Sequence, residues 1–179
     1  MKQTIENYVS QTAVEPIWRR AFFVWSVAAI LIAAWVFLIL LAPLAEANNL
    51  SNISRPLYKF FSFFCHQIPS RSFYLENNPF GVCARCFGVY IGLLGGFLAY
   101  PFFRSVSSTE EPLPRFWLFL AMLPMAFDWS LGFFGVLENT DWSRLLTGAL
   151  LGAACAVFVL PALVEITQHA ARKIKRPSN

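Results

Sequence analysis

The chain has 179 residues, of which 57% are hydrophobic, 17% are aromatic and only 13% are charged. This charged fraction is about half that of an ordinary soluble domain. A water-soluble globular protein is excluded, because so few charged side chains cannot cover the surface of a core that holds 19 Phe and 6 Trp. The formal net charge is +4, but the cations do not form the basic, aromatic-interleaved surface that nucleic-acid binding needs.

Four apolar segments are each long enough to cross about 30 Å of hydrocarbon as a helix. Residues 21–45 carry no charge and follow Arg19 and Arg20, which indicates a retained membrane anchor rather than a cleaved signal peptide. The other predicted spans are 80–103, 116–137 and 144–164, and a basic tail covers 165–179. We therefore expect an all-α fold, in which residues 1–179 form a single polytopic domain of four transmembrane helices in a lipid bilayer.

The connections between these spans differ in length and composition. Residues 46–79 are rich in Asn and Pro and are predicted as a loop. Within it, the aromatic run over residues 57–64 is too short to cross the membrane and suits an interfacial or re-entrant segment. Residues 138–143 are so few that they predict a hairpin between two antiparallel helices.

The Lys and Arg residues predict the orientation of the four spans. One side of the membrane receives nine of them: Lys2, Arg19, Arg20, Arg104, Arg115, Arg172, Lys173, Lys175 and Arg176. The other side receives five: Arg55, Lys59, Arg71, Arg85 and Arg144. Since cytoplasmic segments carry the excess of Lys and Arg, both termini are predicted to be cytoplasmic.

Glycine recurs every four residues in two of the predicted spans. Gly88, Gly92 and Gly96 share one face of the second span, and Gly148 and Gly152 share one face of the fourth. Faces without side chains let another helix approach closely. We expect these faces to pack against helices, including those of other membrane subunits or of a homo-oligomer.

Scarce ligand-type residues gather in a short part of the sequence. Three of the four Cys and one of the two His are Cys65, His66, Cys83 and Cys86. Cys83 and Cys86 form a C-x2-C motif at a predicted helix N-terminus, where the helix dipole and Arg85 favour thiolate. The four residues are of the types that bind tetrahedral zinc, although sequence neighbours such as Cys65 and His66 rarely bind one ion together.

The same residues leave several functions open. The first is a structural or Lewis-acidic metal site, with zinc expected before iron or copper. The second is a thiol-disulfide oxidoreductase, whose four-span architecture is similar to that of quinone-coupled disulfide-forming proteins, although the loop over residues 138–143 lacks their second Cys pair. The third is a non-catalytic accessory subunit of a larger membrane complex. Inert thiols are the remaining interpretation, and no enzyme activity is assigned.

Charged residues near the cysteines supply the candidates for catalytic roles. Asp128 lies inside the third predicted span, where an ionisable group is costly and indicates a functional site. Arg144 opens the fourth span, and we expect it to reach Asp128 across the hairpin. A purely structural ion pair is the alternative. Arg71 and Arg85 complete the expected ring of charge around the cysteines.

Several of these motifs together resemble a known family. Cys65-His66-Gln67, Pro69, Arg71-Ser72-Phe73 and Cys83-x-Arg85-Cys86-x-Gly88 form a first motif, and Asp128 with Arg144-x-x-Thr147-Gly148 falls where a second is expected. The sequence over about residues 64–152 is similar to the family of small predicted integral membrane proteins named domain of unknown function 2085. The resemblance implies a membrane protein with a Cys/His/Arg signature and brings no established activity.

Overall fold

The computed structural model describes residues 11–103, 106 and 114–175, and the side chains of 19–103, 106 and 114–168. The elements are α1 (Gln11–Ala47), α2 (Ser51–Ser62), a 3-10 turn η1 (Pro69–Arg71), the short strands β1 (Tyr74–Leu75) and β2 (Asn78–Pro79), α3 (Ala84–Phe103), α4 (Phe116–Phe133) and α5 (Asp141–Lys175). Four of these helices have segments long and apolar enough to cross a membrane: Arg19–Ala47, Ala84–Phe103, Phe116–Phe133 and Asp141–Gln168. The predicted all-α membrane fold is confirmed.

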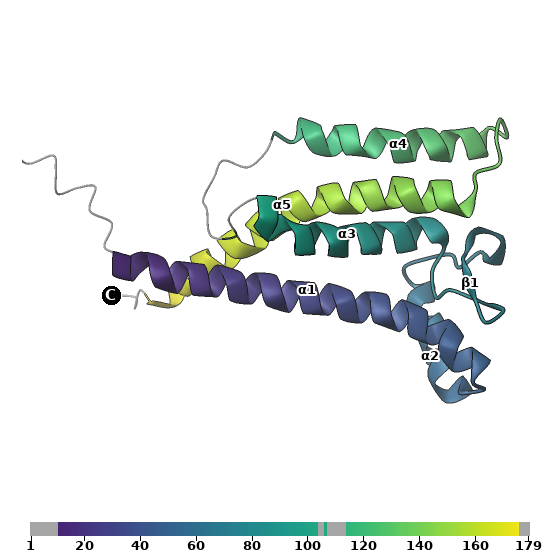
Figure 1. Ribbon diagram of the computed structural model, residues 1–179, viewed down its shortest axis with the longest axis horizontal. Helices are drawn as coiled ribbons and strands as arrows, with labels where there is room; N and C mark the ends of the chain where they lie inside the picture. Colours follow the sequence, from purple (N-terminus) through teal and green to yellow (C-terminus); the bar gives the residue numbers. More distant parts are fainter. Residues whose placement is uncertain (1–10, 104–105, 107–113, 176–179) are drawn as a thin grey trace, which may run out of the picture.

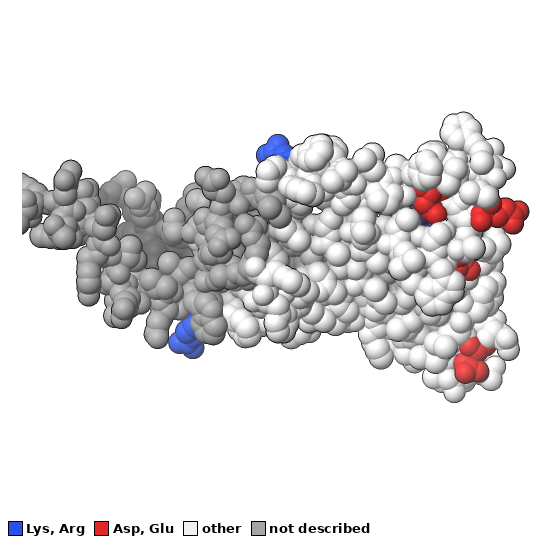
Figure 2. Space-filling model, turned by 45° about the horizontal axis from the view of Figure 1, so that its top comes forward, with Lys and Arg blue, Asp and Glu red and all other residues white. Residues whose placement is uncertain are grey.

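The helices run along the long axis of the molecule (Figure 1). The start of α1 and the end of α5 lie toward the same end of the bundle, as an even number of spans requires. The opposite end, which we call the hairpin end, is formed by residues 48–83 and 134–140. In the view of Figure 2, the visible Asp and Glu side chains gather at the hairpin end. Six of the cations on which the predicted orientation depends lie outside the described side chains: Lys2, Arg104 and the four cations of the tail.

The predicted loop over residues 46–79 contains structure, which corrects that prediction. Helix α2 occupies its first half, and β1 pairs with β2 as an antiparallel hairpin in which Tyr74 faces Pro79. The turn residues Glu76 and Asn77 have positive φ angles of 49° and 62°. Polar residues on the outer face of α2 concealed a helix whose inner, aromatic face packs against α1.

Local capping sets the ends of α4 and α5. The predicted span 116–137 ends at Phe133, because Gly135 takes a φ of 68° and the Val136 amide donates to the Leu131 carbonyl at 3.0 Å. Helix α5 begins at Asp141 because the Thr140 hydroxyl accepts a hydrogen bond from the Ser143 amide at 3.1 Å. It continues beyond residue 164 to Lys175, so the predicted tail begins as helix.

The two glycine rows pack against each other inside the chain. A Cβ atom added to Gly92 would lie 2.0 Å from the Ala149 carbonyl oxygen, and one added to Gly152 would lie 2.0 Å from the Val89 carbonyl oxygen. The backbones of α3 and α5 therefore touch directly. Each glycine face is covered by the other within the chain, in agreement with the prediction that these faces pack closely against helices.

The apolar core has two parts. Near the chain ends, α1, α3 and α5 bury Ala21, Phe97, Tyr100, Ala156, Leu160 and Val164; near the hairpin end the buried residues are Val36, Ile39, Phe61, Cys65, Val82 and Phe87. Helix α4 contributes to neither cluster, and its one buried residue is Asp128. The exposed aromatic and aliphatic side chains of α4 suit contact with lipid. Because α4 adds no buried apolar residue to the core, its position depends on polar contacts at the hairpin end.

Candidate metal centre at the hairpin end

Cys65 is held in the aromatic core beneath α1. The Trp35 ring of α1 contacts the rings of Phe60, Phe61 and Phe64 at centroid distances of 5.5, 5.3 and 5.2 Å. Such aromatic pairs are each worth about 0.5–1.5 kcal/mol beyond the area that they bury. The Cys65 amide donates to the Phe61 carbonyl at 3.0 Å, and the side chain is only 7% exposed. The aromatic run that was predicted to lie at the interface therefore also anchors a cysteine.

Gln67 fixes the loop that carries Cys65. Its side-chain amide donates hydrogen bonds to the carbonyls of Tyr58 at 2.8 Å and Gly81 at 2.7 Å. The backbone of Gln67 itself has a positive φ angle of 48°. The Tyr58 hydroxyl donates to the Pro79 carbonyl at 2.6 Å. Burial, reinforced by the Glu46 carboxylate, raises the pKa of Tyr58 to about 12, so the phenol remains a donor. This role of Gln67 was not predicted from the sequence, because a side chain that binds two distant carbonyls has no spacing signature.

The C-x2-C motif lies where α3 begins. Cys83 directly precedes the helix, and its carbonyl accepts the hydrogen bond of the Phe87 amide at 2.9 Å. Cys86 follows in the first helical turn, so both side chains lie on one face. The predicted span 80–103 therefore begins at Ala84 rather than at residue 80. Cys83 therefore caps α3 instead of lying inside it.

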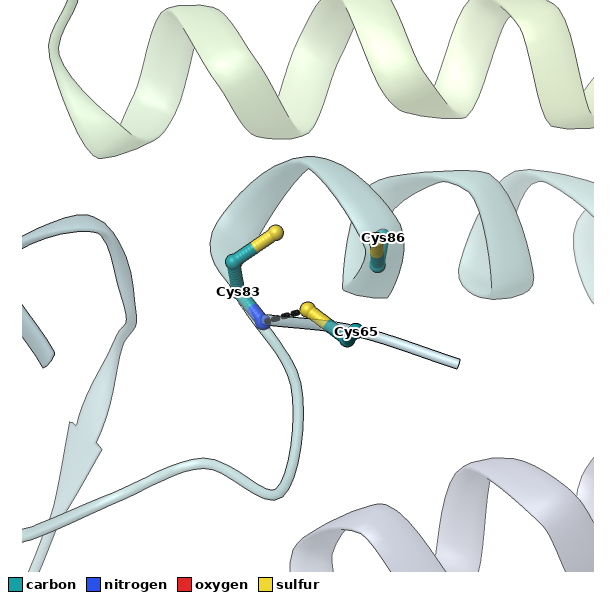
Figure 3. A group of neighbouring side chains, drawn as sticks. All are labelled: Cys65, Cys83 and Cys86. Atoms are coloured by element: carbon teal, nitrogen blue, oxygen red, sulfur yellow. Dashed lines mark hydrogen bonds between the residues drawn. The ribbon is translucent and has the colours of Figure 1, made fainter. Parts of the chain in front are cut away.

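The three sulfur atoms of Cys65, Cys83 and Cys86 lie within 4.8 Å of one another (Figure 3). The backbone amide of Cys83 donates to the Cys65 sulfur at 3.2 Å. The thiols of Cys83 and Cys86, followed by this amide, donate hydrogen bonds that lower the pKa of Cys65 to about 2. All three cysteines are free thiols. The structure thus brings together the three predicted sulfur ligands and favours thiolate at Cys65.

His66 is the predicted ligand that does not join this group. Its side chain is exposed, and the described residues whose ligand atoms gather here are the three cysteines alone. Adjacent residues in an irregular backbone point in different directions, so Cys65 enters the core while His66 remains at the surface. Both nevertheless line a cavity of about 240 Å³ beside the sulfurs.

Asp128 pairs with Arg85 and not with Arg144, which corrects the predicted pair. The Arg85 guanidinium donates to the Asp128 carboxylate, linking α3 to α4 directly beside the C-x2-C motif. Arg144 instead pairs with Asp141 at 3.0 Å, one turn earlier in its own helix. The side-chain amide of Asn139, which the sequence analysis did not single out, donates to the Asp128 carbonyl. Arg71, in η1, is exposed at the cavity edge.

The sequence comparisons agree with this architecture. An uncharacterized protein of Methanocaldococcus jannaschii is 37% identical over 133 residues, which cover 72% of this chain and 85% of that relative. An uncharacterized protein of Methanothermobacter thermautotrophicus is 32% identical over 109 residues, covering 61% of this chain and 91% of that relative. No solved structure matches the chain. Residues 65–158 match the family described as predicted membrane protein, domain of unknown function 2085, and the chain therefore belongs to that family.

Proposed function

We propose that this membrane protein binds a metal ion through Cys65, Cys83 and Cys86, with zinc as the first candidate. The observation that carries the proposal is the convergence of three free thiols from two separate segments within 4.8 Å. A tetrahedral zinc ion with bonds of about 2.3 Å to sulfur separates its sulfurs by roughly 3.8 Å. The observed separations of up to 4.8 Å are within about 1 Å of that spacing. The amide hydrogen bond to the Cys65 sulfur favours the thiolate that a metal requires.

The ligand set also bears on the role of the ion. Three thiolates are soft ligands that suit zinc first, and copper(I) or iron next. They leave one coordination position, and the neighbouring cavity of about 240 Å³ lies beside it. A closed structural site would use four protein ligands, whereas three protein ligands with an open position are typical of Lewis-acidic sites. The geometry therefore favours a site that can accept a further ligand.

The test is the metal content of serine variants. We expect the purified protein to bind one zinc ion, and Cys83→Ser or Cys86→Ser to weaken zinc binding by about 100-fold or more. The estimate follows because structural zinc sites gain roughly 10–16 kcal/mol from a full ligand set, so one ligand in three or four contributes about 3 kcal/mol. Competition with a chromophoric chelator measures the affinity. Cys155→Ser is the matched control, since that thiol lies in the middle of α5.

The same measurement separates the alternatives. His66→Ala is expected to keep one zinc ion, because the imidazole is outside the sulfur group. Thiol counting on the unmodified protein has to find three reactive sulfurs at the hairpin end after zinc is removed. A disulfide between any two of them, with no metal taken up after reduction, would favour the oxidoreductase interpretation and contradict the metal site.

We further propose that the hairpin end faces away from the cytoplasm and that both termini are cytoplasmic. The support is the ratio of nine Lys and Arg residues to five across the alternating loops. A green fluorescent protein fused after residue 179 in a bacterial host is expected to fluoresce, since it folds only in the cytoplasm. Alkaline phosphatase fused at the same point is expected to be inactive. An active phosphatase and a dark fluorescent fusion would reverse the orientation.

A further inference from the structure

Three arginines from different parts of the chain meet at the hairpin end. Arg71 comes from η1, Arg85 from α3 and Arg144 from α5. All three line the cavity of about 240 Å³ that borders the cysteines, and all three also line a second cavity of about 530 Å³ between η1, α4 and the 134–140 hairpin. The two cavities therefore share these three arginines as lining residues.

The carboxylates nearby leave several N–H donors of these three arginines unused. Arg85 donates a hydrogen bond to the Asp128 carboxylate through one terminal nitrogen. Arg144 donates one to the Asp141 carboxylate in the same way, at 3.0 Å. Among the described residues, the guanidinium group of Arg71 has no ion-pair or hydrogen-bonding partner. The Arg85 Nε atom is buried and has no hydrogen-bond acceptor within the described part of the chain. Glu138 is the one acidic residue among the described residues that line either cavity; it is exposed and lines the larger cavity alone.

This arrangement suits a tetrahedral oxyanion. A guanidinium group offers five N–H donors in a planar fork that matches phosphate and carboxylate oxygens. Each of the two paired arginines therefore keeps donors beyond the one that its carboxylate uses. A water molecule occupies about 30 Å³ of liquid, so a cavity of about 240 Å³ has room for a phosphate group together with several waters.

We propose that Arg71, Arg85 and Arg144 bind a phosphate-type oxyanion in the cavity beside the three cysteines. The anion then faces the open side of the metal ion, and in this respect alone the inference rests on the proposed function. A free oxyanion and the phosphate of a membrane lipid share this chemistry, because both offer phosphate oxygens to the guanidinium donors.

Binding of inorganic phosphate to the full-length, zinc-loaded protein in dodecyl maltoside tests the proposal. We expect one phosphate per chain, and at least a tenfold loss of affinity in Arg71→Gln and in Arg144→Gln, measured by equilibrium dialysis. Arg85 is left unchanged, because its removal would also unpair Asp128. Arg55→Gln is the matched control, since Arg55 is an exposed arginine at the same end that lines neither cavity.

A second arm identifies the source of the anion. Phosphatidylglycerol is added to the same maltoside sample in place of inorganic phosphate, and bound phosphorus is counted per chain. The site is supported if either ligand binds and its binding is weakened by Arg71→Gln but preserved by Arg55→Gln. The arm in which this occurs identifies the source of the anion. No binding in both arms, or equal losses in Arg71→Gln and Arg55→Gln, overturns it.

Zinc content of every sample separates this inference from the proposed function. Phosphate binding by a chain that takes up no zinc would keep the anion site and remove the metal site. Zinc uptake by a chain that binds neither phosphate nor phosphatidylglycerol would keep the metal site and remove the anion site.

Discussion

Gly92→Ala is expected to destabilise the protein by about 3 kcal/mol, at the upper end of the cost of overpacking a core. The added methyl group would lie 2.0 Å from the Ala149 carbonyl oxygen and 2.6 Å from its Cα atom. These are backbone atoms of α5, so no side-chain rotation relieves the contact, and α3 and α5 have to separate. Unfolding by sodium dodecyl sulfate in mixed micelles, followed by tryptophan fluorescence, measures the change.

Gly95→Ala is the matched control on the same helix. A Cβ atom at Gly95 meets no atom within 4 Å, so this variant is expected to be as stable as the unmodified protein or slightly more stable. Both substitutions add the same methyl group and change helix propensity equally. Equal stability of the two variants would show that α3 and α5 are not in backbone contact.

Asp128→Asn is the second substitution with a large expected effect, because it leaves the half-buried Arg85 guanidinium without its counter-charge. Removing one partner of a buried ion pair typically costs about 3–5 kcal/mol. We expect a value near 3 kcal/mol, since the Arg85 side chain retains 18% exposure. Helix α4 packs little apolar surface into the core, so its position relative to α3 depends on this pair. The same detergent titration applies.

A double-mutant cycle shows whether the cost comes from the pair. The double variant Arg85→Gln with Asp128→Asn is expected to be less destabilised than the sum of the single variants, with a coupling of about 1–3 kcal/mol. Asp141→Asn is the comparison, because its pair with Arg144 is a partly exposed contact within one helix and should cost below about 1 kcal/mol. Strict additivity for Arg85 and Asp128 would refute the proposed link between α3 and α4.

The spans were predictable from the sequence because lipid imposes a length and a composition on them. Four uncharged or nearly uncharged segments of about 20 residues identify the helices without any tertiary information. Their ends were less predictable, since they depend on local capping such as the Schellman turn at Gly135. Helix α2 was predicted only as a short interfacial or re-entrant aromatic segment over residues 57–64, because its polar face resembles a loop and its aromatic face has meaning only against Trp35.

The candidate site was predictable in part. The clustering of Cys65, Cys83 and Cys86 in sequence identified three side chains that the structure brings together. His66 is separated from them because the direction of a side chain in an irregular loop depends on contacts that spacing does not encode. Arg85, between the two cysteines, pairs with Asp128 across helices, whereas proximity along the hairpin had favoured Arg144. Pairing partners within a bundle depend on helix rotation, which the sequence leaves open.

Zinc K-edge X-ray absorption of the zinc-loaded, full-length protein tests most directly whether the three cysteines form one metal centre. The expected spectrum contains three sulfur neighbours at about 2.3 Å and one lighter atom. In Cys65→Ser the sulfur count should fall to two, although Cys65 is distant in sequence from the C-x2-C motif. A first shell made only of oxygen and nitrogen, or a sulfur count that Cys65→Ser leaves unchanged, would contradict a shared site.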